Sequence, residues 1–223
     1  MRTKTILSAL AVTLTLAAAP AGAVVITPFE RAYNVDGDTT APAGVVETLD
    51  ASGLGSVAIT LTGAGPHFVL GFFDYDLDEV LNGFSNEVSA AVGVPAPGLS
   101  YETDEPGWQF GDIFGHFLNN TLSNTVLGGP EDISLALGWN FILATAQTAV
   151  VTFIIDDLLP AGGFYLRQDD PRSEYSLYLR STLLITGGII EPPPPDPTGV
   201  PEPTTLALLA AGLLSLGLRR RRA

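Results

Sequence analysis

The sequence contains no cysteine, and this absence excludes disulfide bonds, thiolate metal sites and a thiol nucleophile. It is also poor in cations. Between residues 24 and 200 there are four arginines, no lysine and 23 acidic residues, a balance of −19. A surface this negative repels phosphate backbones, which argues against nucleic acid as a partner of this region.

Signatures of enzymes are mostly missing as well. We find no Gly-x-Ser-x-Gly, His-Glu-x-x-His or Gly-x-Gly-x-x-Gly pattern, and a P-loop needs a lysine that residues 24–200 lack. The two histidines, His67 and His116, are interpreted as packing or edge residues. A glycosidase needs only two well-placed carboxylates, so a secreted hydrolase stays open as a third function. We expect the chain not to be an enzyme.

The first 23 residues are typical of a secretory signal peptide. Arg2 and Lys4 precede an uncharged, mostly apolar stretch over residues 6–19. Ala21 and Ala23 then give the small-x-small pattern that signal peptidase recognises. We predict cleavage after Ala23 and export, the alternative being an N-terminal membrane anchor.

The other end has three parts in a fixed order. Residues 191–203 contain seven prolines and predict an extended spacer of about 40 Å. Residues 204–218 carry no charge, and as a helix they span about 22 Å, less than the ~30 Å hydrocarbon core. The four arginines that follow can reach the headgroups and stay in the cytoplasm. This order predicts a single C-terminal transmembrane helix, whereas a buried helix or a permanent anchor are the alternatives.

The motif Pro201, Glu202 and Pro203, followed by the apolar stretch and the arginine cluster, resembles the PEP-CTERM sorting signal of Gram-negative bacteria. The resemblance implies that the membrane protease-transpeptidase exosortase reads this motif. It also implies an inner-membrane-tethered intermediate that is then sorted to the cell surface or extracellular matrix. The implied organisation is a signal peptide (1–23), a body (24–190), a Pro-rich linker (191–200) and a sorting signal (201–223) whose stop-transfer cluster is Arg219, Arg220, Arg221 and Arg222.

The body shows mostly the period-two alternation of β-strands. Dense apolar runs at 68–73 and 149–155 predict central strands that are buried on both faces. Glycine- and proline-rich turns separate the runs, and a short helix is expected within 111–118. We therefore predict an all-β body that forms an antiparallel β-sandwich or jelly roll. The remaining expected strands are 24–26, 45–49, 57–61, 133–140, 163–167 and 175–185.

The body also resembles a group of uncharacterised exported proteins that carry the same sorting tail, and this group implies no activity. The resemblance rests on short stretches along the body, at residues 73–79, 82–87, 104–106, 111–113, 135–139 and 163–168.

The densest group of candidate ligands is Asp74, Asp76, Asp78 and Glu79. Alternate carboxylates project to one side of an extended segment, and hard oxygen ligands suit calcium. The spacing does not fit an EF-hand loop, because Glu79 stands where glycine is required. The alternative is a solvated acidic turn that ends the strand 68–73, and the pairs 156–157 and 169–170 are interpreted as solvated turns too.

Aromatic side chains are expected mainly in the core, but Trp108 is flanked by acidic residues and could stack on a sugar. Our first hypothesis is an exported surface or matrix protein with a structural or adhesive body, stabilised by calcium if the acidic group binds it. The alternative is a carbohydrate-binding β-sandwich module with extracellular polysaccharide as its partner.

Overall fold

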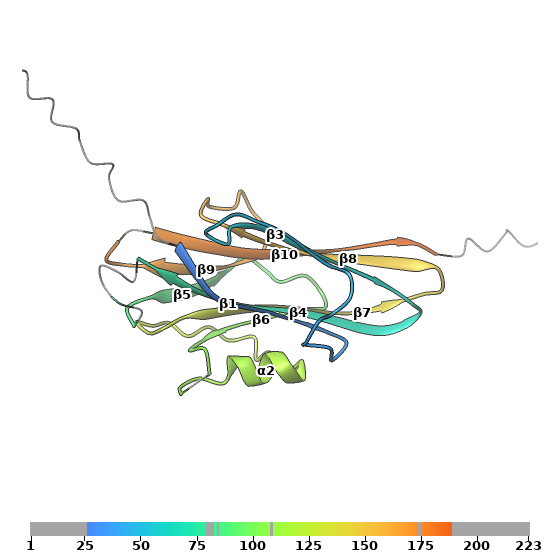
Figure 1. Cartoon of the computed structure of the whole chain (residues 1–223), viewed down its shortest axis with the longest axis horizontal. Helices are drawn as coiled ribbons and strands as arrows, with labels where there is room; N and C mark the ends of the chain where they lie inside the picture. The colour runs from blue at the N-terminus through green and yellow to red at the C-terminus, as the bar shows by residue number, and fades with distance from the viewer. Residues whose placement is uncertain (1–25, 79–82, 84, 108, 174, 189–223) are drawn as a thin grey trace, which may run out of the picture. The chain divides into compact units, whose positions relative to one another are not determined.

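The computed structural model describes residues 26–78, 83, 85–107, 109–173 and 175–188. These residues form ten strands and one short helix (Figure 1). In chain order the elements are β1 (Ile26–Val35), β2 (Val45–Leu49), β3 (Gly55–Thr62), β4 (Gly65–Leu77), β5 (Val88–Val92), β6 (Leu99–Asp104), α2 (Ile113–Asn119), β7 (Ser134–Leu143), β8 (Gln147–Asp156), β9 (Tyr165–Asp170) and β10 (Tyr175–Gly187).

The strands form two sheets that lie face to face (Figure 1). One sheet has four strands in the order β1-β4-β7-β6, and the other has six in the order β2-β3-β8-β10-β9-β5. The paired strands run antiparallel throughout both sheets. The predicted all-β body of antiparallel sheets is therefore confirmed.

The main core lies between the two sheets. Alternate residues of β4 point into it, and the ring of Phe73 packs 5.6 Å from that of Phe153 on β8. Gly71 leaves room for these rings, because a Cβ at this position would lie 2.6 Å from the Phe73 ring. The indole N–H of Trp139 on β7 donates to Ser181 Oγ on β10 at 2.9 Å, so polar contacts also join the layers.

A second, smaller core lies on the outer face of the four-stranded sheet, where α2 covers β4 and β7 (Figure 1). Leu70 and Phe72 of β4 contact Ile113 and Phe117 of α2. Since β4 is buried on both faces, the prediction of a doubly buried strand at 68–73 is confirmed. The same prediction for 149–155 is wrong, because only alternate residues of β8 are buried and no helix covers its other face in the described part of the chain.

Several boundaries differ from those predicted. The strand from residue 68 continues to Leu77, so the acidic turn expected after Phe73 is wrong. Most of β1 and all of β5 and β6 were not predicted, because their residues are half-buried and polar side chains interrupt the apolar alternation. Pro28 fits in β1 because β1 is an edge strand with a register shift next to that residue.

The predicted helix within 111–118 is confirmed as α2. In the part of the chain that the structure describes, no helix is long and apolar enough to cross a membrane. The predicted signal peptide (1–23), linker (191–200), transmembrane stretch and sorting signal (201–223) all lie outside the described residues.

Candidate functional site

The helix α2 is held firmly against the outer sheet face. Ile113 and Phe117 are one turn apart and both are fully buried, while the ring of Phe72 lies 5.9 Å from that of Phe117. The buried side chain of Asn34 on β1 donates to the carbonyls of Phe117 (2.9 Å) and Leu118 (3.0 Å), which would otherwise lack partners at the helix end. The position of α2 relative to the sheet is therefore well defined.

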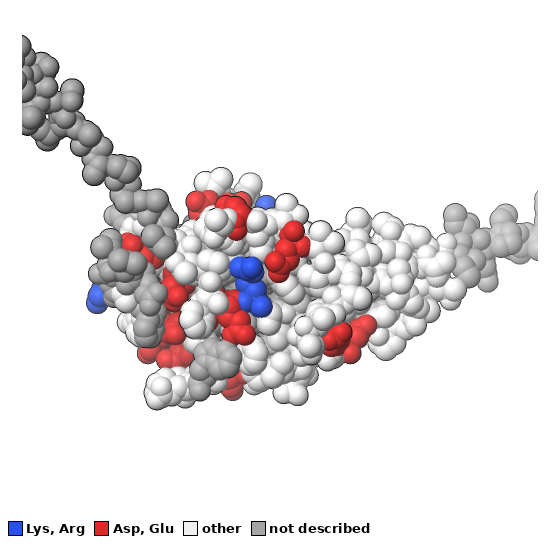
Figure 2. Space-filling view, viewed as in Figure 1, with Lys and Arg blue, Asp and Glu red and all other residues white. Residues whose placement is uncertain are grey.

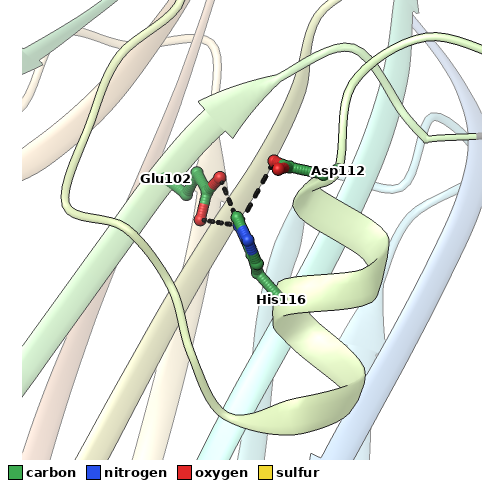
Figure 3. A group of neighbouring side chains, drawn as sticks. All are labelled: Glu102, Asp112 and His116. Carbon is green, nitrogen blue, oxygen red and sulfur yellow. Dashed lines mark hydrogen bonds and ion pairs between the residues drawn. The ribbon is translucent and has the colours of Figure 1, made fainter.

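This position brings together three residues that we call the histidine cluster, namely Glu102, Asp112 and His116 (Figure 3). His116 Nδ1 lies 2.8 Å from Oε1 and 3.1 Å from Oε2 of Glu102, which projects from β6. The same nitrogen lies 3.3 Å from Oδ1 of Asp112, one turn earlier in the helical segment. One imidazole nitrogen thus faces two carboxylates that come from different elements.

The surroundings of the histidine cluster fix its geometry. Glu102 is only 2% exposed, and its Oε2 accepts a hydrogen bond from the backbone N–H of Ser123 at 2.7 Å. The backbone N–H of Asp112 donates to Asp104 Oδ2 at 3.0 Å. The hydrogen bond to Glu102 raises the pKa of His116, and the charges of Glu102 and Asp112 add to this effect. The two carboxylates therefore favour the protonated, positively charged form of the His116 imidazole.

An open pocket of about 280 Å³ adjoins the histidine cluster. All three cluster residues line it, and the hydroxyls of Ser123 and Thr125 lie in its wall. A ligand in this pocket would meet oxygen acceptors, hydroxyl groups and one imidazole, a set that suits cations and hydrogen-bonding molecules.

A second pocket, of about 340 Å³, lies before α2, and we call it the acidic pocket. Partial burial raises the pKa of Glu105 in its wall, and repulsion by Glu131 and Asp104 adds to the shift. The lining residues are Ser85, Glu105, Pro106, Gln109, Phe110, Glu131 and Asp132.

The acidic pocket is also where the predicted sugar-stacking region lies. Trp108 itself is outside the described residues, but Pro106, Gln109 and Phe110 on either side of it line the pocket. The Phe110 side chain is 61% exposed, although the core was the expected place for such rings. Sugar stacking by Trp108 stays a prediction, and Phe110 is an exposed aromatic ring in the same pocket as carboxylates and an amide.

The predicted calcium ligands Asp74, Asp76 and Asp78 are all buried, at the end of β4. Asp74 accepts a hydrogen bond from Ser134 Oγ at 2.9 Å, and burial raises its pKa to about 7. Among the described residues, these three are not part of any group that brings three ligating atoms within 4.8 Å of one another. Glu79 lies outside the described residues, so calcium binding by the full set stays a prediction.

Glu87 forms a different kind of polar centre, inside the body. Its carboxylate accepts hydrogen bonds from the backbone N–H groups of Leu77 (2.9 Å) and Ile133 (3.3 Å), and from Gln168 Nε2 (2.6 Å). Gln168 also donates to the carbonyl of Tyr75, at 2.6 Å. Glu87 therefore joins the strand ends of one sheet to β9 of the other, and burial raises its pKa to about 8.

Asp170, which we expected in a solvated turn, is also buried. It lies at the end of β9, is 1% exposed, and accepts hydrogen bonds from Asn86 Nδ2 and from Ser173 Oγ. The interpretation as a solvated turn is therefore wrong for Asp170, because its carboxylate is buried and bonded to Asn86 and to Ser173 in the turn that follows β9.

The two histidines have unequal environments. His67 stacks on Phe141, which agrees with its interpretation as a packing residue, and pairs with the single carboxylate of Asp36 at 2.7 Å. His116 instead belongs to a polar cluster, so the interpretation of His116 as a packing residue is incomplete. No pattern in the sequence links Glu102 to residues 112 and 116, because the link is the packing of α2 on β6.

On the face of the molecule that Figure 2 shows, acidic side chains lie in several groups and basic side chains are few. Arg31 and Arg167 each pair with an acidic residue, Glu47 and Asp169 respectively. The negative balance predicted for the body is therefore displayed on its surface, and it makes binding of cations favourable.

Comparison with known proteins identifies one element of the chain. The profile of the PEP-CTERM protein-sorting motif matches residues 199–222. The chain carries a PEP-CTERM sorting motif. This match confirms the resemblance of the C-terminal region, and it supports an exported protein that exosortase recognises and sorts. Searches of curated proteins and of solved structures returned no match.

Proposed function

We propose that the chain is a surface or matrix protein whose β-sandwich acts as a structural or adhesive module. The observation that carries the proposal is the PEP-CTERM motif at 199–222, which follows a body of two packed antiparallel sheets. A sandwich with two cores and a polar link between its sheets gives a rigid body for such a role. Its acidic surface suits a hydrated, cation-rich matrix.

The sorting half of this proposal is tested in the host by replacing Pro201, Glu202 and Pro203 with alanine. We expect the native chain at the cell surface or in the matrix fraction, and the variant in the inner-membrane fraction. Replacing the linker prolines Pro193 and Pro194 with alanine is the control, since these lie before the matched residues. Surface localisation of the triple variant would contradict the proposal.

The structural or adhesive half is tested by deleting the gene and restoring it. We expect the deletion strain to lose surface attachment or matrix cohesion, and the native chain to restore it. The triple variant at the sorting motif should fail to restore it, because the body no longer reaches the surface. Full attachment by the deletion strain would reject the adhesive role, and it would not affect the conclusion about sorting.

Carbohydrate binding is the second candidate function, and the acidic pocket favours it. An exposed aromatic ring, an amide and carboxylates are the groups with which proteins hold sugars, and Phe110, Gln109 and Glu105 supply all three. In a binding assay with the host's polysaccharide, Phe110→Ala or Trp108→Ala should weaken binding by about threefold to tenfold, the worth of one stacked ring. Phe29→Ala is the control, because Phe29 is 69% exposed and does not line the pocket.

Calcium binding at Asp74, Asp76, Asp78 and Glu79 remains a proposal of its own. An ion that binds only the folded chain adds about 2.7 kcal/mol at a hundred times its dissociation constant. Melting the full chain with calcium and then with a chelator measures this gain. An unchanged midpoint would reject calcium as a stabilising ligand.

A further inference from the structure

We propose that the histidine cluster is a binding site for a divalent first-row transition metal of the zinc type. Glu102, Asp112 and His116 each offer a ligand atom, and these atoms all lie within 4.8 Å of one another. Figure 3 shows the imidazole of His116 directed at both carboxylates. The ligands come from β6 and from the α2 segment, so the packing of α2 creates the site.

The separations between the ligand atoms fit a small tetrahedral ion. Bonds of about 2.0–2.1 Å to nitrogen and oxygen place the ligand atoms of a tetrahedral site about 3.3 Å apart. His116 Nδ1 lies 2.8 Å from Oε1 of Glu102 and 3.3 Å from Oδ1 of Asp112. An ion that replaces the Nδ1 proton would therefore need only a small outward shift of these side chains.

The donor set selects the class of metal. One imidazole nitrogen with two carboxylates is typical of zinc and its first-row neighbours, whereas calcium takes six to eight oxygen ligands and magnesium keeps most of its waters. A nitrogen ligand is a poor choice for either of the hard ions. The site is thus different in chemistry from the all-oxygen group predicted at Asp74 to Glu79.

Two features of the surroundings support a bound metal ion, namely the orientation of Glu102 and the excess of negative charge. Glu102 is almost fully buried and is oriented by the Ser123 N–H, which is the kind of outer hydrogen bond that positions metal ligands. In the described part of the chain, His116 is the only basic side chain that pairs with Glu102 or Asp112. Because the cluster has two carboxylates and at most one positive charge, a divalent cation would neutralise it.

The same geometry assigns a role to the ion. It would tie the beginning of α2 to β6, next to the acidic pocket and the exposed Phe110. Three protein ligands leave the fourth tetrahedral position open, and the pocket of about 280 Å³ lies beside it. A water molecule or an oxygen atom of a ligand can occupy that position.

The chain contains its own control. His67 also pairs with a carboxylate, Asp36 Oδ2 at 2.7 Å, but it has only that one, and its Nε2 lies 3.0 Å from the carbonyl of Gly63. His67 therefore tests whether a histidine–carboxylate pair alone is enough to hold the metal.

The test is calorimetric titration of the full, tag-free chain with Zn²⁺ after removal of metals by chelator. We expect one saturable site, abolished in His116→Gln and unchanged in His67→Gln. Asp112→Asn is the milder variant, because the Asp112 side chain is 70% exposed and its loss leaves the fold intact. It should weaken binding by about tenfold, whereas His116→Gln removes the site.

Two further measurements, with Co²⁺ and with Ca²⁺, complete the test. Co²⁺ should give the visible absorption of a tetrahedral nitrogen–oxygen site in the native chain and in His67→Gln, and lose it in His116→Gln. Ca²⁺ should give no heat that depends on His116. The proposal is overturned by the absence of a saturable Zn²⁺ site, or by Zn²⁺ binding that survives His116→Gln, or by binding that depends equally on both histidines.

Discussion

Glu87 and Glu102 are buried to the same degree, at 0% and 2% exposure, yet they have different partners. Glu87 meets only neutral donors, the N–H groups of Leu77 and Ile133 and the Gln168 amide. Burial raises the pKa of Glu87 to about 8, so the protonated form of this carboxyl group is favoured at neutral pH. Glu102 meets an imidazole, and it raises the pKa of His116. Two carboxyl groups at the same depth thus take part in different kinds of contact, one with neutral donors and one with an imidazole.

The two carboxyl groups also differ in what can reach them. Glu87 is fully buried, and it links the end of β4 and the residue before β7 to β9. Glu102 lies beside an open pocket and takes part in a cluster with three ligating atoms. The first is a structural link, and the second is available to a ligand.

The largest effect should follow from Glu87→Ala. It leaves two buried backbone N–H groups and one amide donor short of acceptors, and each such loss costs ~1–3 kcal/mol. We expect the free energy of unfolding in urea to fall by about 3–4 kcal/mol. The control is Glu47→Ala, because Glu47 is exposed and its contacts lie at the surface, an ion pair with Arg31 at 3.8 Å and a hydrogen bond from the Tyr33 hydroxyl at 2.6 Å. A loss of under 1 kcal/mol for Glu87→Ala would show that the link carries little of the stability.

The second effect is a fall in stability as pH rises. Burial raises the pKa of Asp74 from 3.8 to about 7 and that of Glu87 from 4.5 to about 8. The folded state then binds more protons than the unfolded state, so this stability is complete below about pH 4 and is lost as pH rises through 7 and 8. Each group contributes up to about 1.4 kcal/mol per pH unit within that window.

Urea unfolding across pH 4–9 measures this slope, with Asp74→Asn and Glu87→Gln as variants that cannot ionise. Each variant should reduce the fall in stability between about pH 4 and 8. A native profile that rises between pH 5 and 8 would contradict the direction of both pKa shifts.

The third effect separates the two histidines in the absence of metal. His116→Gln removes the imidazole partner of a buried carboxylate, and we expect a loss of about 1–2 kcal/mol at pH 6. His67→Gln removes a pair whose carboxylate, on Asp36, is 40% exposed, so its loss should be within about 1 kcal/mol. Equal losses, measured by urea unfolding with chelator present, would show that the burial of Glu102 has no energetic consequence.

The sequence predicts the sheets of this body better than its sites. Apolar alternation locates β3 and β10, and the dense apolar runs locate β4 and β8, because these strands supply the core. It does not locate β5 or β6, which lie at sheet edges and in which mostly half-buried residues alternate weakly. The strand β4 continues past Phe73 because β1 pairs with it as far as Leu77, while the ladder with β7 reaches Asp74.

The histidine cluster could not be predicted for a related reason. Asp112 and His116 have the i, i+4 spacing of one helix face, but Glu102 joins them only through the tertiary contact of α2 with β6. Short motifs detect ligands that are near in sequence, and the predicted calcium group was chosen on that basis. By contrast the sorting motif at 199–222 is read as a linear segment, so its recognition needed no structure.

The smallest effect concerns a third carboxyl group, at the surface. Partial burial and the charges of Glu131 and Asp104 raise the pKa of Glu105, so ionised Glu105 is held against repulsion at pH 7. Glu105→Gln should therefore raise the free energy of unfolding, by about 0.5 kcal/mol at low salt, and the gain should shrink as salt screens the charges. Glu47→Gln is the matched control, since it removes an attraction to Arg31 and should lower stability slightly. If both variants shift stability in the same direction, the contrast drawn from the partners of a carboxyl group holds only for buried ones.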